Sequence, residues 1–143
     1  MQVTTELMQE CVVEVQRQLL TSNDLVSRAE QPFYYGHLSV PPILTEFNFI
    51  VFAGAVDING YFPTHNKKFS QPLTGDHEKD LASNRTKRVF SDRTGSRCGK
   101  NTEIFLLQTY KRDTGEIMHD LSSPIYVNGK HWGGFRIGYL AQI

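Results

Sequence analysis

Three β-rich segments joined by two turn signals occupy the last third of the chain, and they restrict its fold more than any other sequence feature. The first connector is Arg112-Asp113-Thr114-Gly115 and the second is Asn128-Gly129, and both are rich in residues that favour tight turns. Strands joined by so few residues run antiparallel. We therefore predict a three-stranded antiparallel meander from residues 103–111, 116–127 and 130–141.

Two further strands are predicted upstream. β-branched and aromatic residues dominate positions 47–56, as expected of a largely buried strand. Asn59-Gly60 is a pair favoured in tight hairpins because both positions need positive φ, so residues 61–65 are expected to return antiparallel. Residues 66–101 are polar and predicted to cover the sheet, with one short helix at 78–89. The fold class is thus α+β, with one five-stranded antiparallel sheet and a helical and loop cover.

The first 30 residues contain neither glycine nor proline, and their apolar and small residues recur at alternating spacings of three and four. This spacing predicts a long helix with one apolar stripe, which could pair with a second copy in a homodimer. Ser22-Asn23-Asp24 either continue this helix or cap a second one. We expect a signalling or dimerisation helix at residues 1–31 and a sheet domain at residues 47–143. The stripe consists of Thr5, Met8, Val12, Val15, Leu19, Ser22, Val26 and Ala29.

Charge and composition narrow the partners of the chain. Its 143 residues include 15 Lys and Arg against 15 Asp and Glu, so no net charge attracts nucleic acid or an anionic membrane. No apolar run approaches the roughly 20 residues of a membrane helix, and the start lacks the pattern of a signal peptide. Cys11 and Cys98 are too few for a disulfide framework or a zinc cluster. We expect a soluble protein in the cytoplasm.

Catalytic and metal-binding signatures are missing from the sequence. It contains no Gly-x-Ser-x-Gly elbow, no glycine-rich phosphate loop and no cysteine at a known spacing from a histidine, so an enzyme is not expected. The five histidines share no HxxH or HExxH spacing, so no metal site is predicted. His65 follows Pro-Thr and either bonds a backbone carbonyl at a turn or contacts a ligand. His119 and Asp120 are neighbours in a predicted strand, so they face opposite sides of the sheet and cannot act as a pair.

Basic side chains offer a candidate anion site. Arg85, Lys87, Arg88 and Arg93 form the one basic cluster in the sequence, which is either an exposed helix face or a clamp for a carboxylate or phosphate. In the predicted strand 103–111, alternation places Gln108, Tyr110 and the following Arg112 on one face.

The last predicted strand carries an arginine between two glycines on one face. Gly134, Arg136 and Gly138 alternate onto the same side, so there is room above the strand for something larger than a side chain. A surface ion pair of Arg136 explains the pattern equally well.

Several ordered blocks between residues 47 and 139 resemble the PAS/Cache-like module at the carboxy end of some bacterial methyl-accepting chemotaxis proteins. They are VDINGYFPTHN at 56–66, NRTKRVFSDRTG at 84–95, FLLQTYKRD at 105–113, MHD at 118–120, SPI at 123–125 and GKHWGGFRI at 129–137. The resemblance implies a ligand-sensing domain of a chemotaxis signal transducer, which binds a small molecule and relays the bound state through the N-terminal helix. It also implies other receptor segments in a parent protein. Together with the helix stripe and the cysteine content, we expect a homodimer in the cytoplasm, alone or within a membrane-anchored receptor.

The alternation of side chains along the predicted strands and the resemblance together give a candidate ligand site. Its arginines would bind an anionic group of the ligand and its aromatic residues the apolar body, while no cofactor is identified. Two alternatives remain open: a ligand-free protein-interaction or dimerisation module of PAS-like fold, and a gas or redox sensor that holds haem b through one inward histidine. The candidate residues are Tyr61, His65, Arg85, Arg88, Gln108, Tyr110, His119 and Arg136.

Overall fold

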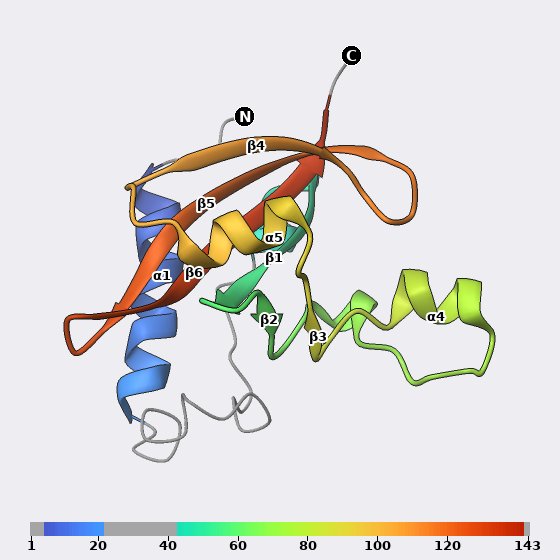
Figure 1. Cartoon of the computed structure of the whole chain (residues 1–143), viewed down its shortest axis with the longest axis horizontal. Coiled ribbons are helices and arrows are strands. Elements are labelled where there is room, and N and C mark those ends of the chain that lie inside the picture. The colour runs from blue at the N-terminus through green and yellow to red at the C-terminus, as the bar shows by residue number, and fades with distance from the viewer. Residues whose placement is uncertain (1–4, 22–42, 142–143) are drawn as a thin grey trace.

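Four strands form one antiparallel sheet in the order β1-β6-β5-β4 (Figure 1). The computed structural model describes residues 5–21 and 43–141. The predicted meander is confirmed, since β5 pairs with β4 on one side and with β6 on the other. Asn128 and Gly129 form the β5–β6 turn with φ values of 49° and 75°, as a tight hairpin requires. The strands are β1 (Ile50–Asp57), β4 (Leu106–Lys111), β5 (Ile117–Val127) and β6 (Lys130–Leu140).

The predicted fifth strand does not join this sheet. β2 (Tyr61–Phe62) pairs instead with β3 (Arg88–Val89) in a separate two-stranded sheet. The reason lies in Asp57, whose Oδ1 accepts the N–H groups of Asn59 at 2.8 Å and Tyr61 at 2.9 Å. This side-chain turn directs the chain away from β1, so the expected return of residues 61–65 along that strand was wrong.

A side chain takes the place of a strand at the outer edge of β1. The Ala53 N–H donates to Oδ1 of Asn66 at 2.9 Å. Asn66 directly precedes the short 3₁₀ helix η1 (Lys67–Phe69) at the start of the cover. The cover therefore contacts the sheet edge through an amide and not through a ladder of backbone hydrogen bonds.

The cover contains two α-helices where the sequence predicted one at 78–89. They are α4 (His77–Ser83), capped by Asp76, and α5 (Arg93–Lys100), capped by Asp92. Each aspartate accepts two backbone N–H groups of the first turn, which satisfies donors that a helix cannot pair itself. α5 lies across the sheet, whereas α4 lies apart from it (Figure 1). Residues 84–89, which the prediction placed in the helix, include β3.

Helix α1 (Thr5–Thr21) packs on β5 and β6, across the face of the sheet away from α5 (Figure 1). Its stripe faces the sheet of the same chain, because Val15 and Leu19 are fully buried in one core with Phe135 and Ile137. The expected pairing of these positions with a second copy was therefore wrong. The predicted break at Ser22-Asn23-Asp24 lies outside the described residues, as do Val26 and Ala29.

The start of the sheet domain adds to the same core. A short helix, α3 (Ile43–Glu46), precedes β1 and buries Ile43 beside the residues that α1 covers. None of the helices in the described ranges is both long and apolar enough to span a membrane.

The opposite face of the sheet is built around glycines of β6. A Cβ at Gly138 would lie 2.1 Å from the Phe52 ring, and one at Gly134 would lie 2.7 Å from the carbonyl oxygen of Cys98. Phe52 of β1 and Cys98 of α5 thus occupy the space beside Arg136 that the sequence pattern indicated for a larger occupant. The glycines serve the packing of the protein itself.

Adjacent leucines in α1 test this packing. Leu19→Ala is expected to lower the free energy of unfolding by about 2–5 kcal/mol, because it removes buried methyl groups and leaves a cavity. Leu20 is 45% exposed, and Leu20→Ala should change that free energy by about 0.5 kcal/mol or less. Urea denaturation followed by circular dichroism measures both. Equal effects of the two substitutions would contradict the orientation of α1.

Candidate functional site

A cavity of about 380 Å³ lies between the sheet and the segment 62–92. β1, β4 and β6 supply one wall, and the cover supplies the other. Side chains of one strand alternate between the two faces, so the cavity lies on the face away from α1. The lining residues are Phe52, Phe62, His65, Arg85, Arg88, Val89, Phe90, Ser91, Asp92, Tyr110, Lys111, Arg112, Asp113 and Arg136.

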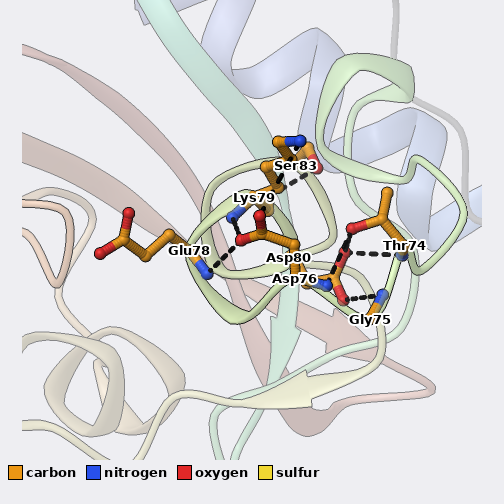
Figure 2. A network of polar contacts seen from close by, with 7 residues as sticks. All are labelled: Thr74, Gly75, Asp76, Glu78, Lys79, Asp80 and Ser83. Atoms are coloured by element: carbon orange, nitrogen blue, oxygen red, sulfur yellow. Dashed lines mark hydrogen bonds and ion pairs between the residues drawn. The ribbon is translucent and has the colours of Figure 1, made fainter.

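A polar network fixes the loop that carries α4 (Figure 2). The carboxylate of Asp80 accepts the N–H and hydroxyl of Thr74, both at 2.8 Å, and the N–H of Gly75 at 3.0 Å. Asp76 caps the helix at Glu78 and Lys79. The loop and the helix are therefore tied together by side-chain acceptors, although both are exposed.

The carbonyl groups of α4 hold two cavity arginines in place. Arg85 donates through Nη1 to the Leu81 carbonyl at 3.0 Å, and Arg88 donates through Nη2 to the carbonyls of Asp80 and Asn84. The carbonyls at the end of a helix carry partial negative charge, which makes them suited to guanidinium groups. These two arginines, for which the sequence left open an exposed helix face or an anion clamp, are thus positioned by the helix that precedes them.

Asp113 connects this pair of arginines to the sheet. Its carboxylate lies 2.7 Å from Nη1 of Arg85 and 3.9 Å from Nη1 of Arg88. Asp113 stands in the β4–β5 turn, so the ion pairs join the cover to the edge of the sheet.

Arg112 lines the cavity, and part of its guanidinium group is buried without a partner. Its side chain is 7% exposed, its Nη1 lies 4.0 Å from Glu116, and its Nε and Nη2 are buried with no hydrogen-bond partner among the described residues. The guanidinium lies over the rings of Phe69 at 5.0 Å and Phe52 at 5.7 Å. Burial and the charge of Arg85 lower the pKa of Arg112. These two donors are thus enclosed by protein, and the described residues supply no acceptor for them.

Arg136 is anchored from below by a buried acid. Its Nε donates to Oδ2 of Asp120 at 2.6 Å, and both side chains are at most 4% exposed. The guanidinium also lies 5.4 Å from the centre of the Phe52 ring. Loss of Asp120 would leave a buried charge without a counter-ion, so this pair supports the fold as well as the cavity.

His65 contributes a neutral ring. It stacks on Phe62 with 4.3 Å between ring centres, and its Nδ1 accepts the Asn66 N–H at 2.8 Å. Burial and then the charges of Arg85, Arg112 and Arg136 lower its pKa to about 3. A neutral imidazole that accepts at Nδ1 carries its proton on Nε2.

The same tautomer does not fit the haem alternative. Coordination of iron through Nε2 would require that atom to lose its proton and Nδ1 to lose the bond from Asn66. His119 lines no part of the cavity. In the part of the chain that the structure describes, no three His, Cys, Asp or Glu side chains gather into a metal-binding group.

Five of the eight predicted site residues line the cavity: His65, Arg85, Arg88, Tyr110 and Arg136. They come from segments far apart in the sequence, and whether they bind a ligand stays a prediction. Burial raises the pKa of Tyr110, so its hydroxyl is neutral at physiological pH.

The other three predicted residues lie elsewhere. Tyr61 is buried in the apolar core that α1 covers. Gln108 donates to the Thr94 carbonyl at 3.0 Å beneath α5. His119 bonds the hydroxyl of Thr109 at 2.8 Å on the opposite face of the sheet.

Several cavity residues were missing from the predicted set, and Arg112 is the most important. Its strand position already placed it on the same face as Tyr110, which was the signal for including it. Phe52, Phe62 and Phe90 supply much of the apolar lining. Single phenylalanines in predicted strands and loops give no sequence signal that separates a cavity from a core.

Comparisons with known proteins give little further guidance. No protein family model and no curated protein matches this chain. One similar solved structure is an extracellular ligand binding receptor from Desulfohalobium retbaense DSM5692, with a TM-score of 0.49 and 19% sequence identity. The match covers 94% of this chain and 24% of that one, so the chain spans about a quarter of the receptor. This likeness assigns neither a family nor a ligand to the protein.

The buried imidazole predicts a pH dependence. An unfolded histidine has a pKa of about 6.5, whereas that of folded His65 is about 3. Between these values the unfolded chain binds a proton that the folded chain does not, so stability is lost as pH falls through this window. One such proton contributes a slope of about 1.4 kcal/mol per pH unit.

His65→Asn tests this slope, because an asparagine oxygen can replace Nδ1 as acceptor for the Asn66 N–H. Urea denaturation of both proteins between about pH 6 and pH 5 should show a smaller slope in the variant, by up to about 1.4 kcal/mol per pH unit. At pH 8 the His65 ring is neutral in both the folded and the unfolded protein. The difference in the free energy of unfolding between wild type and variant at this pH therefore reports the change in packing alone. Parallel curves at all pH values would show that His65 titrates normally in the folded protein.

Proposed function

We propose that this protein is a ligand-sensing domain that binds a small anionic molecule in the cavity. The proposal is carried by four arginines that line one cavity together: Arg85, Arg88, Arg112 and Arg136. The Nε and Nη2 edge of a guanidinium matches two oxygens of a carboxylate or phosphate with parallel hydrogen bonds.

The charge balance of the cavity supports an anion. Five cationic side chains line it, against the two acidic side chains Asp92 and Asp113. Asp120 below the cavity also balances the charge of Arg136. The excess of positive charge is therefore smaller than five against two, but it is still positive. The cationic residues are Arg85, Arg88, Lys111, Arg112 and Arg136.

Aromatic residues suit the body of such a molecule. Phe52, Phe62, Phe90 and Tyr110 share the lining with the arginines. Concave sites of a few hundred Å³ that combine apolar walls with a few polar groups are typical of small-molecule binding. The proposed ligand is therefore an organic anion with an apolar part.

The position of α1 supports a sensory role. Arg136 lines the cavity, while its neighbours Phe135 and Ile137 in β6 face the core that α1 covers. A displacement of this strand by a bound ligand would reach the helix directly, since packed interiors transmit small shifts. Together with the resemblance of the sequence blocks, this favours a PAS/Cache-like domain of a bacterial chemotaxis transducer. We propose a non-enzymatic, cytoplasmic domain, and a homodimer that uses surfaces other than the buried stripe of α1.

A ligand-free interaction module is the second candidate. It is favoured by exposed apolar side chains at the β4 edge, where Ile104 is 69% and Leu107 is 59% exposed. Exposed apolar groups at a sheet edge are suited to contact with another chain. This function predicts no response of the melting temperature to any small anion.

A thermal-shift screen separates the two. Mono- and dicarboxylates with aliphatic or aromatic bodies, and phosphate esters, are compared with the neutral amides of the same acids at constant ionic strength. At least one anion should raise the melting temperature saturably, since a ligand at about 100 times its Kd adds about 2.7 kcal/mol of stability. Its neutral amide should have no effect.

Substitution of Arg112 tests the assignment within this screen. Arg112→Met should abolish the anion-induced shift without lowering the ligand-free melting temperature, because it removes two buried unpaired donors. Arg97 is an exposed arginine of α5 outside the cavity, and Arg97→Met should retain the full shift. The proposal fails if no anion stabilises the wild-type protein, or if Arg112→Met responds like Arg97→Met.

A further inference from the structure

Asp113 already occupies part of the cationic surface that the proposed ligand would use. Its carboxylate is 2.7 Å from Arg85, and its side chain is 40% exposed against 5% for that arginine. The anion of this pair therefore comes from an exposed turn, while the cation belongs to a buried wall of the cavity.

The two arginines do not depend on Asp113 for their positions. Arg85 also donates to the Leu81 carbonyl, and Arg88 donates to the carbonyls of Asp80 and Asn84. Withdrawal of the Asp113 carboxylate would leave both guanidinium groups in place with free hydrogen-bonding capacity toward the cavity.

The turn that carries Asp113 is exposed at residues 113–115. It is closed by backbone bonds from the Arg112 N–H to the Glu116 carbonyl at 2.8 Å and from the Gly115 N–H to the Arg112 carbonyl at 2.9 Å. A Cβ at Gly115 would meet no atom within 4 Å among the described residues. Among the described residues, Arg85 is the one hydrogen-bond donor to the Asp113 carboxylate. Its departure from Arg85 would therefore break this one hydrogen bond and the longer ion pair with Arg88 at 3.9 Å.

We infer that Asp113 is a specificity-determining residue of the proposed site, because its carboxylate competes with the ligand for Arg85 and Arg88. This inference rests on the anion-binding function proposed above. A ligand with a single negative charge is satisfied at Arg112 and leaves Asp113 in place. A ligand with two negative charges would also need Arg85 and Arg88 and would have to displace Asp113, since two anions at one cation repel each other. Asp113 therefore disfavours dianions, and its displacement would shift the turn that also carries Arg112.

Inorganic sulfate is a suitable probe, as a dianion with no apolar body. The melting temperature is followed during titration with sodium sulfate against sodium chloride of equal ionic strength. Asp113→Asn should bind sulfate at least about tenfold more tightly than the wild type, which corresponds to about 1.4 kcal/mol. Removal of the internal competitor, and not a general gain of positive charge, is the expected cause.

Glu103→Gln is the control. Glu103 is an exposed acid in the segment before β4, and it does not line the cavity. Its substitution changes the net charge equally but should change the sulfate affinity less than about twofold. Adding Arg112→Met to Asp113→Asn should abolish the response and so place the sulfate in the cavity.

The outcomes separate this inference from the function on which it rests. If organic anions stabilise the wild type but Asp113→Asn binds sulfate no better than Glu103→Gln, Asp113 has no part in specificity while the proposed function stands. If no anion stabilises either protein, both are wrong. A lower ligand-free stability of Asp113→Asn with unchanged sulfate affinity would show that Asp113 only supports the turn.

Discussion

Two glycines of β6 fix the positions of the groups that pack on the cavity side of the sheet. Phe52 lies directly on Gly138, and Cys98 lies directly on Gly134, at separations that no larger residue would permit. Phe52 then becomes the surface on which Arg112 and Arg136 rest. A methyl group added at either glycine would push apart the parts that define the cavity, although neither glycine touches its interior.

The unusual feature of this cavity is the set of buried guanidinium groups in its lining. Each lies on an aromatic ring, with Arg85 5.6 Å from the Phe90 ring and Arg112 and Arg136 at comparable distances from Phe52. A ring face attracts a cation and leaves the in-plane N–H groups free for hydrogen bonds. Only Arg136 has a fully buried acid as partner. The protein thus keeps charge in a partly dehydrated site, which lowers its own stability and would strengthen the binding of the proposed anion.

The sequence predicted the parts of the fold that local chemistry decides. Asn128-Gly129 adopts positive φ at both positions, and the meander follows from it. Asn59-Gly60 looked equivalent, but only Gly60 has a positive φ, +80°, because the Asp57 side chain controls that turn. The partner of the α1 stripe could not be predicted, since a helix stripe at that spacing packs equally well on a sheet or on a second helix. Likewise, side-chain alternation correctly placed Gln108 and Tyr110 on the same face of the sheet. The position of α5 above Gln108 decides that, of the two, only Tyr110 reaches the cavity.

The two edges of the sheet differ in their capacity to bind a further strand. At β1, Asn66 occupies the Ala53 N–H with a side-chain amide and so interrupts the row of backbone groups that an incoming strand would need. At β4, no strand among the described residues pairs with the outer edge. Addition of strands is therefore restricted to one side. Two sheets joined edge to edge at β4 would each present only the interrupted β1 edge outward, and so they would form a closed pair in place of an open-ended fibre.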